Sequence, residues 1–234
     1  MPKISTMSLK NRGETLRNLL LNHEYGVPLS PTKLHSLFGV NYALAHRYAK
    51  SGWLTRIKDG PYAVSGELIT QLGVVSFLSE KVKMHIGGRS ALVLRNTAHY
   101  LRFREKIILY GSNPKYKLPS WTSPYDLLYT TKNPFYDKLP LDYAISSIST
   151  NVFVSEKERA LLEMLDGIPK YYSLKEVEEI ASSLTTLRHD VLAELIEKCH
   201  RKKVRYLFNK IKKKYGMTWL EDPAKKPNNK RSAK

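Results

Sequence analysis

The sequence predicts an α+β protein with two domains. Three observations predict this class: two short helical patterns joined by a glycine at residues 28–52, a hairpin pattern at 53–64, and helical periodicity through the last third of the chain. We expect a flexible arm at residues 1–10, a first domain at 11–80, a second domain at 81–220 and a disordered basic tail at 221–234. A chain of 234 residues is long enough to bury a real core.

The first of the two short helices has well-placed start and stop signals. Ser30 can cap it by accepting a backbone N–H, and Pro31 fits the first helical position because its missing donor would be unpaired there anyway. The helix is expected to end at Phe38. Gly39 then permits the sharp turn that a helix-turn-helix requires.

The second short helix is expected to run from its cap, Asn41, to about Ser51 and to have two contrasting faces. Val40, Leu44 and Tyr48 form an apolar stripe for the core. The opposite face interleaves small residues with hydrogen-bond donors, as a helix in a major groove would, while an ordinary solvated face is the alternative. The candidates for contact with DNA bases or phosphates are Asn41, Tyr42, Ala45, His46, Arg47 and Lys50.

A β-hairpin pattern follows the second helix. Two strand-like segments flank Asp59-Gly60, which is a preferred two-residue turn. Arg56 and Lys58 occupy alternate positions beside the turn, so we expect both to face the phosphate backbone next to the groove. With a first helix at residues 15–25, this order predicts a winged helix-turn-helix in the first domain.

The composition indicates an anionic partner. A net charge of +18 and a pI near 9.8 are typical of proteins that bind nucleic acid, an acidic membrane surface or an acidic protein. The membrane is the weaker option, because no apolar run approaches the ~20 residues of a spanning helix and the first residues carry no hydrophobic leader. The single cysteine, Cys199, excludes an internal disulfide and a cysteine-based zinc cluster. We therefore expect a cytoplasmic protein.

The second domain opens with a strand, a diglycine and a helix. Residues 82–86 alternate as in a strand, Gly87-Gly88 interrupt it, and residues 90–98 predict a helix that precedes a buried strand at 106–110. A diglycine before a helix can cradle a phosphate. Since neither a dinucleotide fingerprint nor a phosphate loop is present, tight strand-to-helix packing explains the glycines better.

The middle of the chain, residues 113–149, is rich in proline, tyrosine and threonine, which predicts short strands joined by turns. Five aromatic residues here invite comparison with a platform that stacks single-stranded bases: Trp121, Tyr125, Tyr129, Phe135 and Tyr136. The interpretation we favour is that they belong to a core.

The last third is predicted to be helical. Ser155 with Glu158, and Ser173 with Glu176, have the spacing of capping boxes, and a further amphipathic helix spans 187–199. Residues 201–214 combine an apolar stripe with eight basic residues and no acidic one: Arg201, Lys202, Lys203, Arg205, Lys210, Lys212, Lys213 and Lys214. We expect this basic face to contact DNA phosphates, or an acidic partner or tRNA, and a solvated face is the alternative.

Several stretches together resemble one known family. After the winged-helix pattern, the runs HIGGRSALVLRNTAHYL, EKIILYG, LPSW, SEKERALLEML and KVRYLFNKIKKKYGMTW are similar to the AbiEi family of antitoxins from bacterial abortive-infection toxin–antitoxin operons. The resemblance extends from about Leu16 to Trp219. It implies an N-terminal domain that binds DNA and represses its own operon, and a C-terminal domain that counters a nucleotidyltransferase-like toxin encoded alongside.

The same resemblance implies the partners. These are double-stranded operator DNA with inverted repeats, occupied by two copies of the protein, and the toxin, opposed with or without stable contact. A monomer in solution that pairs on DNA fits the lack of an obvious heptad seam.

The chain carries no recognisable catalytic motif. No Asp or Glu is followed two positions later by Lys, and neither His-Glu-x-x-His nor Gly-x-Ser-x-Gly occurs, so we expect no enzyme, no cofactor and no metal site. Capping and solvation are the favoured explanation for the carboxylates of Glu156, Glu158 and Glu163. Two other functions stay open: a winged-helix transcription factor with a sensing domain and no toxin, and an RNA-binding module that uses the basic C-terminal helix.

Overall fold

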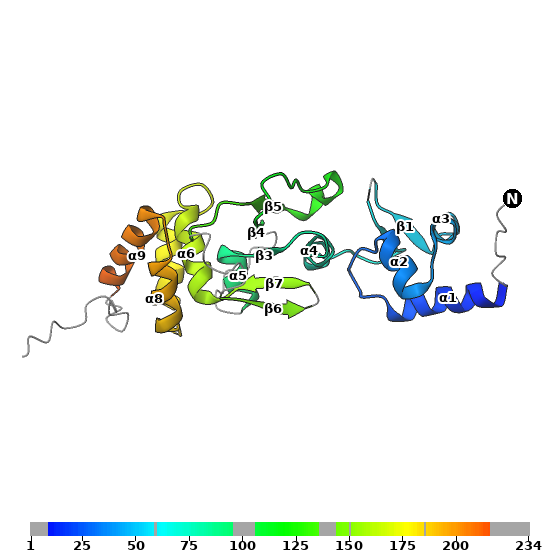
Figure 1. Cartoon of the computed structure of the whole chain (residues 1–234), viewed down its shortest axis with the longest axis horizontal. Helices are drawn as coiled ribbons and strands as arrows, with labels where there is room; N and C mark the ends of the chain where they lie inside the picture. Colours follow the sequence, from blue (N-terminus) through cyan, green and yellow to red (C-terminus); the bar gives the residue numbers. More distant parts are fainter. Residues whose placement is uncertain are drawn as a thin grey trace, which may run out of the picture. The chain divides into compact units, whose positions relative to one another are not determined.

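The protein divides into two compact units (Figure 1). The computed structural model describes residues 9–58, 60–95, 106–135, 144–149, 151–184 and 186–215. Unit 1 comprises residues 1–83, 115–127 and 150–152, and unit 2 comprises residues 84–114, 128–149 and 153–234. The chain therefore passes between the units several times, whereas the sequence suggested one boundary near residue 81. Most of the expected arm and the whole of the expected tail lie outside the described residues.

Unit 1 begins with three helices and a hairpin: α1 (Leu9–Asn22), α2 (Pro31–Phe38), α3 (Tyr42–Lys50), β1 (Leu54–Arg56) and β2 (Tyr62–Val64). The two strands are antiparallel, with Thr55 opposite Ala63. Leu29, between α1 and α2, exchanges two backbone hydrogen bonds of 2.8 Å with Tyr62 and so extends this small sheet. The order is the one predicted for a winged helix, although α1 starts at Leu9, inside the expected arm, rather than near residue 15.

Side-chain caps fix the ends of α2 and α3 as the sequence predicted. The Ser30 hydroxyl accepts the backbone N–H of Lys33 at 3.1 Å, and the Asn41 carboxamide oxygen accepts that of Leu44 at 2.9 Å. Gly39 ends α2 with a φ of 68°, in the left-handed region that favours glycine. Both caps and the turn between the helices are therefore confirmed.

A hydrophobic core joins the helices and the hairpin of unit 1. It consists of ten buried residues: Leu19, Leu29, Leu34, Phe38, Val40, Leu44, Ala45, Tyr48, Leu54 and Tyr62. A fourth helix, α4 (Gln71–Ser79), and a 3-10 helix, η1 (Ser120–Tyr125), complete the unit. The rings of Phe77 and Trp121 meet edge to face at 5.5 Å, and Gln71 donates to the Tyr125 carbonyl at 2.7 Å. Residues far apart in the sequence thus pack together around α4.

Unit 2 contains a five-stranded sheet in the order β5-β4-β3-β7-β6. Its strands are β3 (Met84–Ile86), β4 (Ile107–Gly111), β5 (Leu127–Thr130), β6 (Ile145–Ser149) and β7 (Val152–Ser155). The central strand β3 runs antiparallel to β4, with His85 opposite Tyr110, and parallel to β7, with Ile86 opposite Val154. Because all three residues of β3 are buried, this strand forms the middle of the unit.

The described part of unit 2 contains five helices: α5 (Gly88–Leu94), α6 (Lys157–Gly167), α7 (Leu174–Ser183), α8 (His189–Glu197) and α9 (Lys202–Lys214). Helix α6 contacts each of the other four, and Figure 1 shows α8 and α9 beside it at one end of the sheet. Its residues Leu161, Leu162 and Leu165 are buried, as the sequence predicted. Helix α6 is therefore the central helix of unit 2.

The close approach of α4 to the loop after α1 generates a prediction about stability. A Cβ on Gly73 would overlap the Gly26 carbonyl group, whose carbon would lie 2.7 Å away. We expect Gly73→Ala to lower the free energy of unfolding of unit 1 by roughly 1–3 kcal/mol. Denaturant titration followed by tryptophan fluorescence would measure this change, since Trp53 and Trp121 both lie in unit 1.

The matched control is Gly13→Ala on α1, where a Cβ would meet nothing within 4 Å. Alanine should stabilise that helix by roughly 0.5–1 kcal/mol, because glycine loses more backbone entropy on folding. Equal unfolding midpoints for the two variants would contradict the close packing of α4.

Candidate nucleic-acid interface

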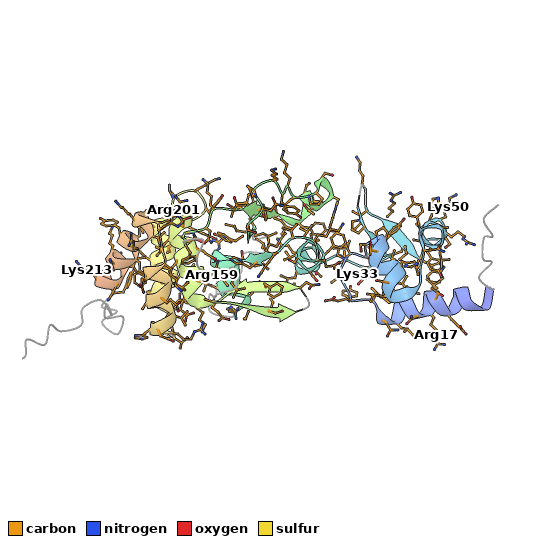
Figure 2. All side chains as sticks on the ribbon, viewed as in Figure 1. Arg17, Lys33, Lys50, Arg159, Arg201 and Lys213 are labelled. Carbon is orange, nitrogen blue, oxygen red and sulfur yellow. The ribbon has the colours of Figure 1, made fainter. Side chains whose placement is uncertain are left out.

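Helix α3 separates its residues cleanly into a buried face and an exposed face. Leu44 and Tyr48 pack into the core of unit 1, whereas His46, Arg47 and Lys50 are exposed. Tyr42 at the start of the helix is 64% exposed, which is unusual for a large aromatic side chain. Figure 2 shows Lys50 projecting from α3. The exposed face thus offers donors and an aromatic ring without a carboxylate.

One predicted contact residue is misplaced. Ala45 is only 1% exposed and belongs to the core, so it is not on the face that solvent reaches. The apolar side of α3 is wider than the stripe at 40, 44 and 48, because the helix packs against both α2 and β1. Ala49 also packs against this core. The exposed alanine is instead Ala43, which lies between Arg47 and Lys50 when α3 is viewed along its axis.

The hairpin next to α3 carries the two other predicted contact residues, Arg56 and Lys58, and both are exposed. Its connection is longer than the predicted two-residue turn. Ile57 donates its N–H to the Pro61 carbonyl at 2.9 Å, and the Ile57 carbonyl accepts the N–H of Gly60 at 2.9 Å. Because proline lacks an N–H, Pro61 cannot donate a hydrogen bond to the Ile57 carbonyl. The N–H of Gly60 donates to that carbonyl instead. Asp59 lies outside the described residues.

Helix α9 has the predicted amphipathic form. Val204, Phe208 and Ile211 are buried, while the exposed face carries Lys202 and Lys210 on either side of Tyr206, which is 68% exposed. Lys213, which Figure 2 labels, extends the same face.

The eight basic residues of 201–214 are not all unopposed, which corrects the sequence-based expectation. Arg201 lies 3.7 Å from the Asp166 carboxylate, and Lys214 forms an ion pair with Glu178. Lys203 donates to the backbone carbonyls of Asp166 and Ile168, both at 2.7 Å, and so satisfies the C-terminal end of α6. Five cations remain without an ion pair to the described part of the chain: Lys202, Arg205, Lys210, Lys212 and Lys213.

Unit 2 contains a buried charge cluster that the sequence does not predict. Glu163 on α6 is 1% exposed, and its carboxylate accepts hydrogen bonds from His85 Nε2 at 2.9 Å, Arg159 Nε at 3.0 Å, the Ser155 hydroxyl at 2.9 Å and the Gly88 N–H at 3.1 Å. The carboxylate therefore connects β3, α5, β7 and α6. The expectation that Glu163 is solvated is wrong, because the fold pairs it with residues up to 78 positions away.

Burial and pairing set the protonation states of this cluster. Burial lowers the pKa of His85 by more than the Glu163 carboxylate raises it, so the ring stays neutral and donates its Nε2–H. Burial acts to raise the pKa of Glu163, but the contacts with His85 and Arg159 outweigh it and the pKa is lowered. The cluster is thus an ionised carboxylate held by one guanidinium and neutral donors.

The first predicted capping box is also wrong, and the second is half formed. Ser155 ends β7 and binds Glu163, while Glu158 accepts hydrogen bonds from the Arg188 backbone at 2.7 Å and its guanidinium at 2.9 Å. Burial acts to raise the pKa of Glu158, but these hydrogen bonds lower it overall. At α7, Ser173 accepts the N–H of Glu176 at 3.1 Å, but the Glu176 carboxylate pairs with Arg89.

The diglycine and two of the five aromatic residues serve packing, as the sequence favoured. A Cβ on Gly87 would meet the Tyr110 ring at 2.6 Å, and the N–H of Gly88 is occupied by Glu163. Trp121 and Phe135 are buried, and Tyr136 lies outside the described residues. The diglycine therefore presents no phosphate cradle, and a core position is confirmed for Trp121 and Phe135, whereas Tyr125 and Tyr129 are partly buried.

The described residues offer neither a metal-binding cluster nor a membrane-spanning helix. No group of three or more His, Cys, Asp or Glu side chains among them could hold a metal ion. None of the helices they form is both long and apolar enough to cross a membrane.

Comparison with known proteins covers nearly the whole chain. Residues 12–103 match the family described as "Transcriptional regulator, AbiEi antitoxin N-terminal domain", and residues 104–232 match "Transcriptional regulator, AbiEi antitoxin, Type IV TA system". A search of curated proteins gave no match. Among solved structures, the RV2827C protein from Mycobacterium tuberculosis is similar, with a TM-score of 0.57 and 14% identity over 92% of this chain and 82% of that one. At this identity the likeness shows the mixed α/β fold alone.

The cluster around Glu163 predicts a pH dependence of stability. His85 and Glu163 both have folded-state pKa values below their ordinary values of 6.5 and 4.5, so each stabilises the fold above its ordinary pKa and loses this contribution as the pH falls through the folded-state value. We expect the free energy of unfolding of unit 2 to decrease as the pH falls below 6.5 and to decrease again below 4.5. Urea titrations across this range, followed by circular dichroism, would measure it.

The variant His85→Gln should flatten the first decrease, because glutamine does not titrate, whereas the exposed-site control His189→Gln should retain it. A His85→Gln profile that is parallel to the unmodified protein between neutral pH and the second decrease would contradict a neutral, buried His85.

Proposed function

The chain belongs to the AbiEi family of transcriptional regulators, the antitoxins of type IV toxin–antitoxin systems, and we propose that it represses its own operon by binding promoter DNA through unit 1. The observation that carries this proposal is the exposed face of α3, which presents Tyr42, His46, Arg47 and Lys50 without a carboxylate. The caps at both helices of the turn hold this face in place. These observations support a winged helix in unit 1 that binds duplex DNA.

The dimensions of α3 support insertion into the major groove. An α-helix is about 10–12 Å in diameter with its side chains, and a major groove about 12 Å wide admits it. Ala43 allows close approach, while Arg47 and Lys50 reach base edges or phosphates. Arg56 and Lys58 on the hairpin would contact the adjoining backbone. The operator is proposed to contain inverted repeats, with one copy of the protein on each repeat.

Unit 2 is proposed to carry the antitoxin activity against a nucleotidyltransferase-like toxin, with or without stable contact. The family assignment supports the antitoxin role of the chain, and unit 2 has its own sheet and central helix. The exposed basic face of α9 is the part of unit 2 best suited to a polyanion or an acidic partner.

RNA binding through α9 is a second candidate function, favoured by one observation. The exposed ring of Tyr206 lies one helical turn from both Lys202 and Lys210, so a base could stack on the ring while the lysines bind flanking phosphates.

The two cations of α3 can be removed without disturbing the core, because both are exposed. Replacing Arg47 and Lys50 together with alanine should weaken binding to the protein's own upstream DNA by roughly 2–4 kcal/mol, because both base and phosphate contacts are lost. Fluorescence anisotropy with that duplex and an unrelated duplex, at low salt and at about 0.15 M salt, would measure the loss.

The matched control is Arg17→Ala with Lys81→Ala, which removes the same charge from exposed positions of unit 1 outside α3. Figure 2 shows Arg17 on α1. If operator affinity is unchanged in the α3 variant, or if the control loses as much, α3 is not the recognition helix.

Lys202 and Lys210 of α9 are exposed as well, so they can be replaced in the same way. The variant Lys202→Gln with Lys210→Gln should lower affinity for structured RNA by about tenfold, because two phosphate contacts are lost. Operator affinity should stay within about twofold, because α9 belongs to unit 2 and the proposed operator contacts belong to unit 1. Competition of RNA against duplex DNA at matched salt is the measurement. The control Lys106→Gln with Lys175→Gln removes two exposed charges elsewhere in unit 2. Equal losses in both variants, or a loss for DNA only, would refute RNA binding by α9.

A further inference from the structure

An open pocket in unit 2 lies beside the start of α9, away from the exposed face considered above. Its volume is about 210 Å³, and its walls come from β4, the end of β5, the turn after α6 and the residues that begin α9. Its lining includes four cationic side chains and one carboxylate: Lys132, Lys170, Arg201, Lys203 and Asp166. The pocket is therefore strongly electropositive, and charge complementarity favours an anionic ligand.

The negative groups of the pocket are already neutralised from within. The carbonyl oxygens of Asp166 and Ile168, at the end of α6, both accept hydrogen bonds of 2.7 Å from Lys203, and the Asp166 carboxylate lies 3.7 Å from Arg201 Nε. A helix C-terminus and a carboxylate would otherwise attract a cation. Because Lys203 and Arg201 meet that demand, the pocket does not require a metal ion or an amine.

Two cations are left to meet a ligand. Lys132 and Lys170 are exposed, and neither forms an ion pair with any part of the chain that the structure describes. The Lys170 ammonium lies 4.9 Å from the centre of the Tyr171 ring, which holds it at the pocket wall. The Thr130 hydroxyl accepts the N–H of Lys132 at 3.1 Å and keeps its own proton to donate.

One wall of the pocket belongs to the core of unit 2. The Tyr110 ring, which lines the pocket, stacks on His85 with ring centres 5.4 Å apart, and His85 is in turn bound to the buried carboxylate of Glu163. Burial raises the pKa of Tyr110 well above its ordinary value, so its hydroxyl stays protonated and adds no negative charge. The pocket is thus held by the central strands of the sheet.

We propose that this pocket binds the phosphate group of a nucleotide. Clustered lysine and arginine donors match phosphate oxygens, and the neighbouring ring of Tyr171 offers a surface for a base. The volume is below the range of about 300–1,000 Å³ for pockets that enclose a drug-sized ligand. A phosphate with part of its sugar therefore fits inside, and the remainder of the nucleotide projects toward solvent. The site is separate from α3 and does not depend on promoter binding.

The test is titration of the full-length protein, by isothermal calorimetry at about 0.15 M ionic strength, with ATP, CTP and inorganic phosphate. A second arm uses a 5′-phosphorylated RNA oligonucleotide and its unphosphorylated counterpart, which distinguishes a free nucleotide from an RNA end as the source of the phosphate. We expect saturable binding of the nucleotides, or preference for the phosphorylated RNA. In either case Lys132→Gln with Lys170→Gln should weaken binding by at least about tenfold.

The control is again Lys106→Gln with Lys175→Gln, which lies outside the pocket and removes the same charge. Both substituted pairs are exposed, so folding should be unaffected, and circular dichroism would verify it. The proposal is overturned if no phosphate probe binds saturably, if the phosphorylated and unphosphorylated RNAs bind alike and the nucleotides do not bind, or if the control weakens binding as much as the pocket variant.

Discussion

The buried carboxylate of Glu163 is the interaction on which unit 2 depends. Four groups from separate segments converge on it: the ring of His85, the guanidinium of Arg159, the hydroxyl of Ser155 and the N–H of Gly88. An ionised carboxylate at this depth is tolerated only because every partner is present, and removing one member of such a buried pair typically costs about 3–5 kcal/mol. The elements that carry these groups, β3, β7, α5 and α6, must therefore assemble together.

This constraint also determines where unit 2 can bind other molecules. The N-terminus of α5 follows a diglycine, as in many phosphate-binding loops, but the Gly88 N–H is already bound to Glu163 and a Cβ on Gly87 would strike Tyr110. An external phosphate has no access there. The cationic groups that remain lie on the outside of the same sheet and helices, in the pocket beside Tyr110 and along α9. The buried charges of unit 2 thus stabilise its fold, and only surface cations are available to bind a ligand.

Sequence reasoning succeeded where the determining contacts are local. The caps at Ser30 and Asn41 and the turn at Gly39 involve residues within a few positions, so the pattern and the cause coincide. It failed where the cause is distant. Ala45 was placed on the wrong face because the width of the buried side depends on what packs against α3. The prediction that Glu163 is solvated is wrong because its partner His85 lies 78 residues away. No local spacing in the sequence indicates that contact.

The net positive charge of the chain gives attraction to DNA but no sequence preference, which α3 would have to supply. With a net charge of +18, the protein should attract any polyanion, and this attraction weakens steeply with salt because it comes from counterion release. Sequence preference needs contacts that are short, directional and excluded from solvent, which clustered lysines do not provide. On α3 the side chains that can make them are Tyr42, His46 and Arg47, held by a capped helix against a rigid core. In the proposed promoter binding, sequence preference would therefore come from a few fixed side chains of α3, while the large positive charge would accelerate the search for DNA.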